Sequence, residues 1–436
     1  MNITFLGATK TVTGSNFLLE AAGKKILVDC GLHQGKATEE MENYEDFAFN
    51  VNEIDCMLLT HAHIDHSGRI PKLYVDGYRG PIIATKATCD LCTIMLPDSG
   101  HIQEMENVWK NKKRARTGKQ ELPPLYTAQD AIDCLKLFKP ANYDEIIDID
   151  EYISIRFNDA GHMLGSSIIE VWVKEKGETK KIVFSGDLGN NDIPLLDSPT
   201  MIETADYPLE FPGLKFTQTA EESKALNDDP YPHIIISASG MCEVGRIKHH
   251  LKHNLWNPKN TILFVGYQAP GTLGAKIVSG EKKVKIFGEE IAVNARIEYI
   301  EGYSGHADQE WLLNFVYSFI TKPKHIFLVH GEPEAQVVLK GKIQDTTEIP
   351  VTIPDYGENY ELTDRIKVVS KVEQADQYKY LRLEVMDRLA TLKEELEDMS
   401  KMIKEDISDE DKKEEEIAEI NNKIKELEQQ IVKVIS

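Results

Sequence analysis

The 436-residue sequence lacks any apolar run long enough to cross a bilayer, which needs about 20 consecutive apolar residues. Its N-terminus shows no basic leader followed by an apolar stretch, so we expect no secretory signal and no membrane partner. Cysteine is scarce, and its 6 scattered residues form a single CxxC pair at Cys89 and Cys92. This usage predicts buried free thiols and a cytoplasmic protein.

Basic residues are in deficit, with 50 Lys and Arg against 72 Asp and Glu and a net charge of −22. Taken alone, this balance argues against a nucleic-acid partner. One stretch is nevertheless locally basic, and either a solvated helix face or a phosphate-contacting patch would explain it. Its charged residues are Lys110, Lys112, Lys113, Arg114, Arg116 and Lys119.

The densest chemical signal lies between Ile54 and Pro71, in the sequence IDCMLLTHAHIDHSGRIP. A short apolar run typical of a buried strand leads directly into His61, His63, Asp65 and His66. Any one of these residues could be a buried core side chain or part of a surface loop. Three imidazoles and a carboxylate on one strand-to-helix loop instead favour a metal site, with two ions within reach of the loop.

Four further potential ligands follow the same rule, because each stands where an apolar strand runs into a Gly-containing turn. They are Asp29 after KKILV, His162 after ISIRF, Asp187 after KIVFS and His330 after IFLV. In α/β and stacked-sheet folds, active sites gather along one such rim of strand ends. The repetition therefore predicts a layered α/β fold in which these side chains converge on the His61–His66 loop.

The segment after Asp187 has a different character. PHIIISASGM and NTILFVGYQAPGTLG read as buried strands of parallel type, with a helix expected over 242–255 between them. Ser237, Ser239 and Gly240 could offer backbone N–H groups to an anion at that helix N-terminus, although an ordinary helix cap explains them equally well.

The tail beyond residue 370 is strongly charged and carries two apolar series at helical spacing. Leu389, Leu392 and Leu396 belong to the first series, and Ile417, Ile420 and Ile424 belong to the second. We expect two amphipathic helices that either fold back as a hairpin or pair with a second copy of the chain.

Taken together, the motifs resemble those of the metallo-β-lactamase superfamily, and specifically its β-CASP branch of RNA-processing nucleases. The resemblance is closest to bacterial and archaeal relatives of the nuclease that cleaves pre-mRNA 3′ ends, and it spans Met1 to about Leu362. The stretches that carry it are VDCG (28–31), THAHIDHSGRIP (60–71), GHMLGS (161–166), SGDLG (185–189), SASGM (237–241), GYQAPGTLG (266–274), YSGHADQ (303–309) and VHGE (329–332).

This resemblance implies an αββα sandwich with an inserted α/β domain of β-CASP type. The implied domains are a first core part over 1–207, an insert over 208–285, a second core part over 286–370 and a helical extension over 371–436. It also implies two zinc ions, with manganese as the alternative. RNA would enter between the core and the insert, and a hydroxide activated by the two ions would cleave its phosphodiester bond.

Residue roles carry over by motif position. One zinc would be held by His61, His63 and His162. The other would be held by Asp65, His66 and His330. Asp187 would bridge the two ions, Asp29 would support the cluster, and Asp65 would serve the catalytic centre as well as the metal. His306 would act as the general acid, and Ser237, Ser239, Gly240 and Ser304 would contact substrate phosphates.

One departure from the family pattern concerns the insert. Relatives carry an acidic motif after the GDLG strand, and here the chain passes almost directly from Tyr207 into the later part of the insert. Either Glu203 or Glu210 could substitute for that acid, and the sequence does not decide between them. The shortened insert leaves two alternatives to a ribonuclease, namely a di-zinc hydrolase of a smaller ester or phosphodiester and a catalytically weak RNA-binding scaffold.

Overall fold

The computed structural model describes residues 1–34, 42–116, 121–189, 213–243, 245–266, 268, 271–300, 305–363 and 366–372. The chain divides into one unit over Met1–Val372 and a second over Glu373–Ser436. The second unit lies outside the described residues, and the tail helices and their pairing therefore stay predictions. Within the described ranges, no helix is both long enough and apolar enough to span a membrane.

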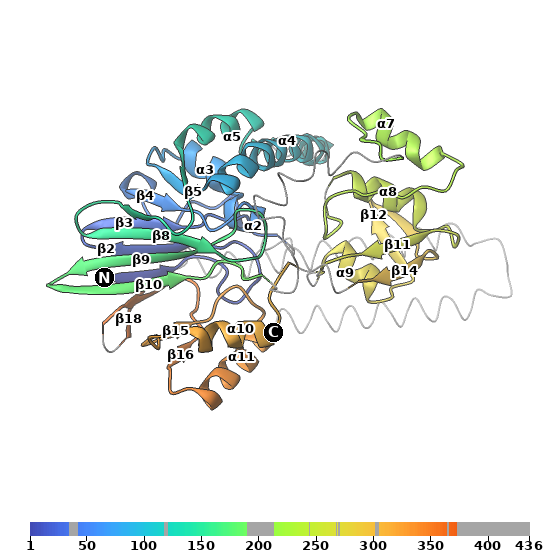
Figure 1. Cartoon of the computed structure of the whole chain (residues 1–436). Helices are drawn as coiled ribbons and strands as arrows, with labels where there is room; N and C mark the ends of the chain where they lie inside the picture. Colours follow the sequence, from blue (N-terminus) through green and yellow to red (C-terminus); the bar gives the residue numbers. More distant parts are fainter. Residues whose placement is uncertain are drawn as a thin grey trace, which may run out of the picture. The chain divides into compact units, whose positions relative to one another are not determined.

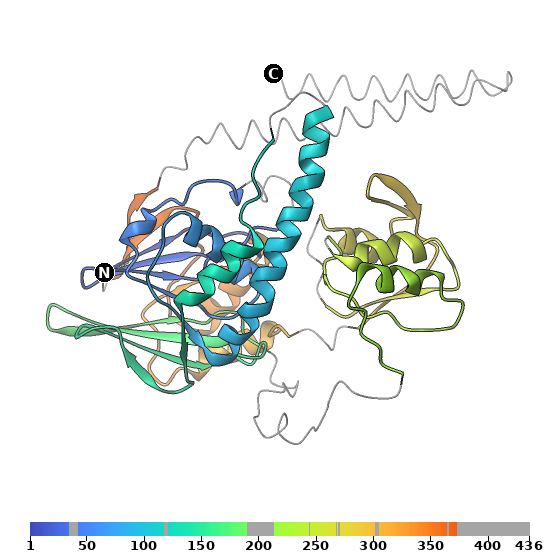
Figure 2. The same cartoon turned by 90° about the horizontal axis from the view of Figure 1, so that it is seen from above.

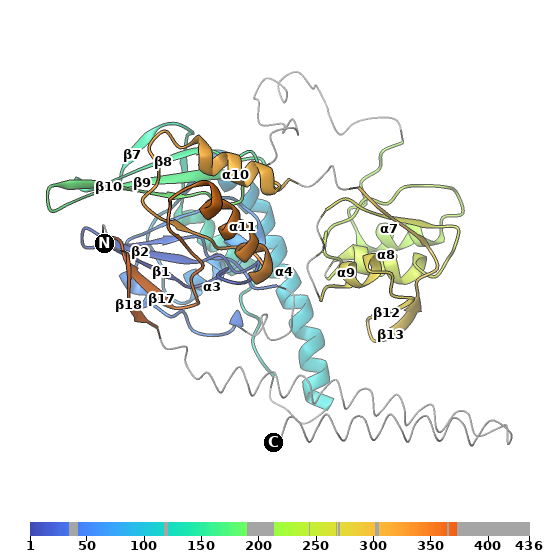
Figure 3. The same ribbon diagram turned by 90° about the horizontal axis from the view of Figure 1, so that it is seen from below.

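The first sheet has eight strands in the order β18-β17-β1-β2-β3-β4-β5-β6. Their bounds are β1 Asn2–Phe5, β2 Phe17–Ala21, β3 Lys24–Val28, β4 Cys56–Leu58, β5 Ile82–Thr85, β6 Phe138–Ala141, β17 Glu358–Glu361 and β18 Lys367–Lys371. The pairs from β3 to β6 are parallel, whereas β1, β2, β17 and β18 pair antiparallel. Figure 3 shows β17 and β18 beside β1 and β2.

The central strands of this sheet are buried on both faces, and alternate side chains enter two different cores. Leu27 and Met57 belong to one apolar cluster, while Val28 and Leu58 belong to the other. This alternation follows from the two-residue period of a strand. It explains why these segments read as continuous apolar runs rather than as alternating apolar and polar residues.

The second sheet has the order β10-β9-β8-β7 and is antiparallel throughout. Its strands are β7 Ile146–Asp148, β8 Ile153–Asp159, β9 Ser167–Glu175 and β10 Glu178–Phe184. Ile155 and Val171 lie in the same cluster as Val28 and Leu58, so the two sheets pack face to face. Fully burying each such side chain is worth about 1.5–3 kcal/mol, which holds the sandwich together.

Helices cover both outer sides of the sandwich (Figure 1). One side carries η1 Val51–Glu53, α2 Ile64–Ser67, α3 Ile70–Val75, α4 Lys86–Arg116, α5 Ala128–Cys134 and η2 Leu135–Leu137. The other side carries α10 Gln309–Ser318, β15 Ile326–Phe327, α11 Pro333–Thr346 and β16 Val351–Thr352. This αββα arrangement confirms the expected fold class. All six cysteines are buried, as the sequence predicts.

The insert has its own small apolar core, built around Leu255, Phe264 and Ile286. Its elements are α7 Ala220–Ala225, η3 Leu226–Asp228, α8 Arg246–Asn254, β11 Thr261–Phe264, α9 Leu273–Val278, β12 Lys283–Ile286, β13 Glu289–Ala292 and β14 Arg296–Tyr299. β14 pairs in parallel with β11, and β12 pairs with β13. The domain boundaries stay a prediction, but these pairings favour an end of the insert after Tyr299 rather than at residue 285.

Two local predictions for the insert are wrong. The apolar stretch at 233–236 forms no strand, and Ile234 and Ile236 are 89% and 90% exposed. An apolar run becomes a buried strand only when neighbouring strands pair with it, and no described strand does so here. The following helix begins at Arg246 rather than at Cys242, with Gly245 as its N-cap residue.

Candidate metal centre

The site gathers at the carboxyl ends of the parallel strands β3 and β4. Asp29 follows β3 directly, and its backbone N–H donates to the Leu58 carbonyl at 3.0 Å. Asp29 adopts a left-handed backbone conformation with φ +58°, as does His330 with φ +56°. Such conformations are uncommon outside glycine and concentrate at functional sites. In both cases the left-handed backbone conformation stands just after a strand, at a residue that could bind a metal ion.

The short helix α2 places Asp65 and His66, and the turn after β3 packs tightly against it. A Cβ atom on Gly31 would lie 1.6 Å from the Asp65 carbonyl oxygen, so only glycine fits there. The Cys30 N–H donates to the His66 carbonyl, and the Ser15 N–H donates to the Asp65 carbonyl. The loop is therefore held by backbone bonds that do not depend on the ligand side chains.

Three histidines direct ring nitrogens at one point. His61 Nε2 and His162 Nε2 each lie 3.1 Å from His63 Nδ1. His162 Nδ1 faces the Gly305 carbonyl at 3.0 Å, and because a carbonyl only accepts, this nitrogen carries the ring proton. The Nε2 atom of His162 then offers a lone pair, as a metal ligand requires.

His61 is oriented by the same logic. The Thr60 hydroxyl lies 3.0 Å from each Asp29 carboxylate oxygen and 3.0 Å from His61 Nδ1. The single hydroxyl proton goes to the carboxylate, so Thr60 accepts a hydrogen bond from His61 Nδ1–H. Lone pairs on His61 Nε2 and His162 Nε2 therefore converge on the place where His63 Nδ1 lies. Three converging imidazole nitrogens are a ligand set that zinc accepts, so the residues present fit a metal ion.

Asp187 presents one carboxylate oxygen to each of two ligand groups. Its Oδ2 lies 3.8 Å from both His61 Nε2 and His162 Nε2, and its Oδ1 lies 3.3 Å from His66 Nε2 and 3.5 Å from His330 Nε2. The first group is His61, His63, His162 and Asp187, and the second is Asp65, His66 and His330. Within each group the ligand atoms all lie within 4.8 Å of one another.

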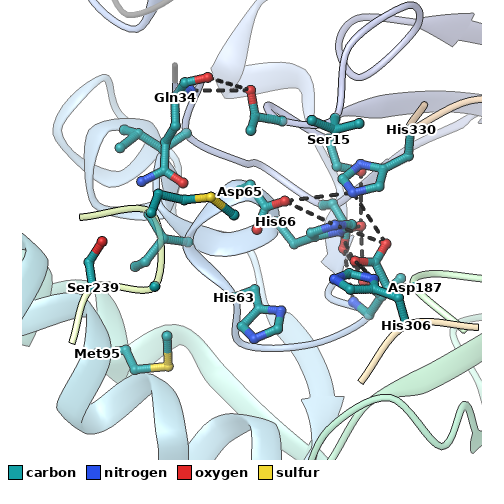
Figure 4. Close-up of a pocket in the computed structure, with 18 of the residues that line it drawn as sticks. Ser15, Gln34, His63, Asp65, His66, Met95, Asp187, Ser239, His306 and His330 are labelled. Carbon is teal, nitrogen blue, oxygen red and sulfur yellow. Dashed lines mark hydrogen bonds and ion pairs between the residues drawn. The ribbon is translucent and has the colours of Figure 1, made fainter. Parts of the chain in front are cut away.

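The second group closes around Asp65. Its Oδ2 lies 3.8 Å from His66 Nε2 and 3.7 Å from His330 Nε2. His66 Nε2 is buried and has no hydrogen-bond partner, while His66 Nδ1 faces Asp29 Oδ2 at 2.7 Å. Figure 4 shows Asp187 beside His66 and His330 in the pocket. An orphaned buried nitrogen facing two carboxylates is the arrangement that a bound cation satisfies.

The electrostatics of the site differ between the two ligand groups. His61 and His162 in the first group are kept neutral, whereas His66 in the second group is surrounded by carboxylates that favour a positive charge. Burial holds the pKa of His61 well below its ordinary value and lowers the pKa of His162 to about 4. Burial acts in the same direction on His66, but Asp187 and Asp29 raise the pKa of that imidazole well above its ordinary value. A cation at this position would compete with the proton on His66.

Asp187 is ionised at neutral pH. Burial alone would raise the pKa of this carboxyl, but His330 and His66 hold the pKa well below its usual range. His306 lies at the edge of the same cluster, with Nδ1 3.7 Å from Asp187 Oδ2 and its ring centroid 4.5 Å from that of His162. The His306 side chain is 52% exposed, so solvent or a substrate can reach it.

The insert residues expected to contact substrate phosphates do not stand at a helix N-terminus as the sequence suggested. Ser237, Ser239 and Gly240 belong to the insert, and α8 begins too late for them to stand at its N-terminus. The Ser237 hydroxyl donates to the Ala238 carbonyl at 3.1 Å, and the Ser239 carbonyl accepts from the Cys242 N–H. Ser304, Glu203 and Glu210 lie outside the described residues.

Sequence reasoning missed two polar residues that orient the ligands. Thr60 connects Asp29 to His61, and the Ser15 hydroxyl donates to Asp29 Oδ2 at 3.2 Å. Thr60 stands immediately before His61, so its position offered a signal. Ser15 lies in an N-terminal loop, and nothing in its local sequence points to a site 14 residues away.

Comparison with known proteins matches three family descriptions to successive parts of the chain. Residues 18–210 match a metallo-beta-lactamase superfamily domain, and residues 169–277 match a Beta-Casp domain. Residues 290–354 match a Zn-dependent metallo-hydrolase RNA specificity domain. The two parts of the core and the insert between them are therefore each recognised by family.

Curated relatives extend over most of the chain. Ribonuclease TTHA0252 of Thermus thermophilus is 31% identical over 82% of this chain and 99% of its own length. Transcription termination factor FttA of Methanocaldococcus jannaschii is 26% identical over 76% of this chain and 67% of its own. Integrator complex subunit 11 of Danio rerio is 23% identical over 82% and 73%.

With the ligand geometry in hand, these matches place the chain in the metallo-β-lactamase superfamily, as a metal-dependent hydrolase. Within that superfamily, the chain belongs to the β-CASP family. Among solved structures, the subclass B3 metallo-β-lactamase BJP-1 of Bradyrhizobium japonicum is 18% identical and covers 39% of this chain and 55% of its own, with a TM-score of 0.24.

Proposed function

We propose that this protein is a zinc-dependent ribonuclease that hydrolyses RNA phosphodiester bonds at a two-metal centre. The observation that carries the proposal is the placement of Asp187, whose two carboxylate oxygens face two separate groups of ligand atoms. A carboxylate shared in this way is typical of metal pairs about 3.5–4 Å apart, which serve in-line phosphoryl displacement. The names and descriptions of the relatives above support RNA as the substrate.

The ligand chemistry favours zinc. His61, His63 and His162 offer three imidazoles to one ion, and Asp65, His66 and His330 offer a mixed set to the other. Imidazole nitrogen and carboxylate oxygen are ligands that zinc accepts at low coordination number, although manganese accepts the same set. When bound, such a pair of ions neutralises phosphate charge and lowers the pKa of water.

The chain's own residues supply orientation and a proton. Thr60 and Asp29 fix the ring proton of His61 on Nδ1, and the Gly305 carbonyl does the same for His162. His306 is exposed at the edge of the cluster, where it can donate a proton to the leaving oxygen of a cleaved phosphodiester. Asp187, kept ionised by its histidine neighbours, lies 3.7 Å from His306 Nδ1.

The test combines metal analysis with a comparison of leaving groups. Purified protein should contain about two zinc ions and should cleave single-stranded RNA. His306→Ala should retain the metal and lose about 10²–10⁴-fold in kcat on RNA, because a general acid contributes that much. On bis(p-nitrophenyl) phosphate, whose leaving group needs no proton, the same variant should lose much less.

Three results would contradict the proposal that this protein is a zinc-dependent ribonuclease. Cleavage that persists after chelation would exclude a metal-dependent reaction. Turnover of bis(p-nitrophenyl) phosphate without any action on RNA would point to a hydrolase of smaller phosphodiesters. Tight RNA binding without cleavage in zinc-replete protein would point to a scaffold.

A cytoplasmic location is part of the proposal and is supported by the six buried thiols.

A further inference from the structure

The C-terminal part of α4 contains a dense run of basic residues. α4 is 31 residues long, and Figure 2 shows it extending past α5. From Lys110 to Arg116 the sequence KNKKRAR contains five basic residues and no acidic one, in a chain whose net charge is −22. Clusters of basic residues of this kind are typical of surfaces that bind a polyanion such as a nucleic acid.

The two sides of this helix end have different surroundings. On one side, Asn107 and Asn111 each donate a side-chain hydrogen bond to the Leu122 carbonyl at 2.8 Å, and the Leu122 N–H donates back to Asn111 at 3.0 Å. The chain that returns from the helix is therefore fastened to the asparagine face. Lys112 and Arg116 each stand five residues beyond one of these asparagines, about 140° around the helix.

Lys112 and Arg116 are one turn apart on the same face, and both are exposed. We propose that this face of α4, represented by Lys112 and Arg116, docks the phosphate backbone of single-stranded RNA at a distance from the metal centre. The inference rests on the proposed ribonuclease function and extends it to a second contact with the same substrate. Contacts of this kind position a strand without reading its sequence.

The separation between the two contacts sets a length requirement. Met95, on the same helix, lines the pocket that contains His63 (Figure 4), and it packs against the same apolar cluster as Ile64, the residue after His63. Seventeen residues separate Met95 from Lys112, which corresponds to about 26 Å of helix. A stacked strand advances about 3.4 Å per nucleotide, so an RNA must be about eight nucleotides long to reach both places. Shorter RNA can occupy the metal centre without reaching Lys112.

An alternative role for the same charges is to stabilise the helix. Lysine and arginine in the last turn interact favourably with the negative end of the helix dipole. That role would affect thermal stability and would be indifferent to RNA length. A length-dependent loss of binding therefore separates the two roles.

The experiment uses the full-length, zinc-loaded chain with RNAs of about 20 and about 4 nucleotides. Lys112→Glu/Arg116→Glu should weaken binding of the long RNA about tenfold, with a loss below about twofold for the short one. Two fewer phosphate contacts should reduce the slope of log K against log salt by about 1.4. The neutral pair Lys112→Gln/Arg116→Gln should show the same ordering with a smaller loss, which covers the case in which charge reversal disturbs folding.

A matched control carries the same change of charge on exposed lysines of the sheets, Lys139→Glu/Lys174→Glu. An equal loss of long-RNA binding in this control, an equal loss for both RNA lengths, or an unchanged salt slope in the α4 variants would overturn the proposal. Failure of the ribonuclease function gives a different pattern. In that case the wild type would bind long RNA in the α4-dependent way and cleave neither length.

Discussion

The core and the insert differ in how far their apolar strands are buried, as β4 of the core and β11 of the insert show. In the core, all three residues of β4 are buried, because side chains on one face enter the helix-covered cluster and those on the other enter the space between the sheets. In the insert, β11 has only Phe264 buried, and Leu263 is 51% exposed. Packing thus fixes β4 from two sides and β11 from one.

This difference matches the location of the chemistry. Both ligand groups found among the described residues draw all their members from the core. Ligands that must stay within a few tenths of an ångström of one another need a support that packing fixes on both faces. We therefore expect the metal centre to depend on the core rather than on the insert, and the predictions below test this expectation.

The largest effect is expected from removing the shared carboxylate. Asp187→Ala deletes the oxygens that face both ligand groups, so we expect less than one bound zinc per chain and a fall in cleavage rate of about 10³-fold or more. Metal analysis and RNA cleavage on the same preparation measure both quantities. Two bound ions in the variant would refute the bridging role.

The matched control changes a histidine of the insert. His253 is exposed near the end of α8 and belongs to neither ligand group. His253→Ala should keep the metal content of the wild type. A loss of zinc here would contradict the claim that the core alone holds the centre.

Substitutions that leave a cavity in the core or in the insert should both lower stability, but only the one in the core should weaken zinc binding. Leu58→Ala in β4 and Ile286→Ala in β12 each remove a fully buried side chain, and each should cost about 2–5 kcal/mol in its own region. Because Leu58 lies two residues before Thr60, its loss should also weaken zinc binding, whereas Ile286→Ala should leave zinc affinity intact. Calorimetric unfolding with and without zinc tests this. Equal zinc loss in both variants would show that the regions are coupled.

A smaller effect is expected from Thr60→Val, which keeps the shape and removes the hydroxyl. The bond from His61 Nδ1 and the hydroxyl bonds to Asp29 are then lost, whereas the backbone N–H of residue 60 still donates to Asp29. Groups that orient a metal ligand in this way typically change metal affinity by about 10–100-fold. Competition with a zinc chelator measures the change, and Thr60→Ser should restore most of the affinity. A Thr60→Val protein with wild-type affinity would show that the hydroxyl plays no part in orienting His61.

The contrast between regions also explains which features the sequence could predict. The central strands of the first sheet were predictable because both of their faces are apolar, and the ligands were predictable because each follows an apolar run. Thr60 was missed since threonine is common at strand ends and its hydroxyl has meaning only once Asp29 lies beside it. Asp29 and His66 meet across 37 residues, and such a contact depends on strand order, which local pattern does not specify.

The stretch at 233–236 was mispredicted for the opposite reason. Its apolar residues match a buried strand locally, but burial also needs a neighbouring strand that sequence pattern cannot supply. The structure exposes Ile234 and Ile236 almost fully, while Ile286 of the same insert is completely buried. The insert therefore contains both kinds of isoleucine within one small region.

The smallest effect is expected at these exposed positions. Ile234→Ala and Ile236→Ala should each change the free energy of unfolding by no more than about 0.5 kcal/mol, because neither side chain leaves a cavity. Ile286→Ala is the matched buried substitution and should cost several times more. Urea unfolding of the three variants measures the difference. A cost above about 2 kcal/mol at Ile234 would mean that this stretch is a buried strand after all, as its sequence suggests, and that the insert resembles the core in how it fixes its strands.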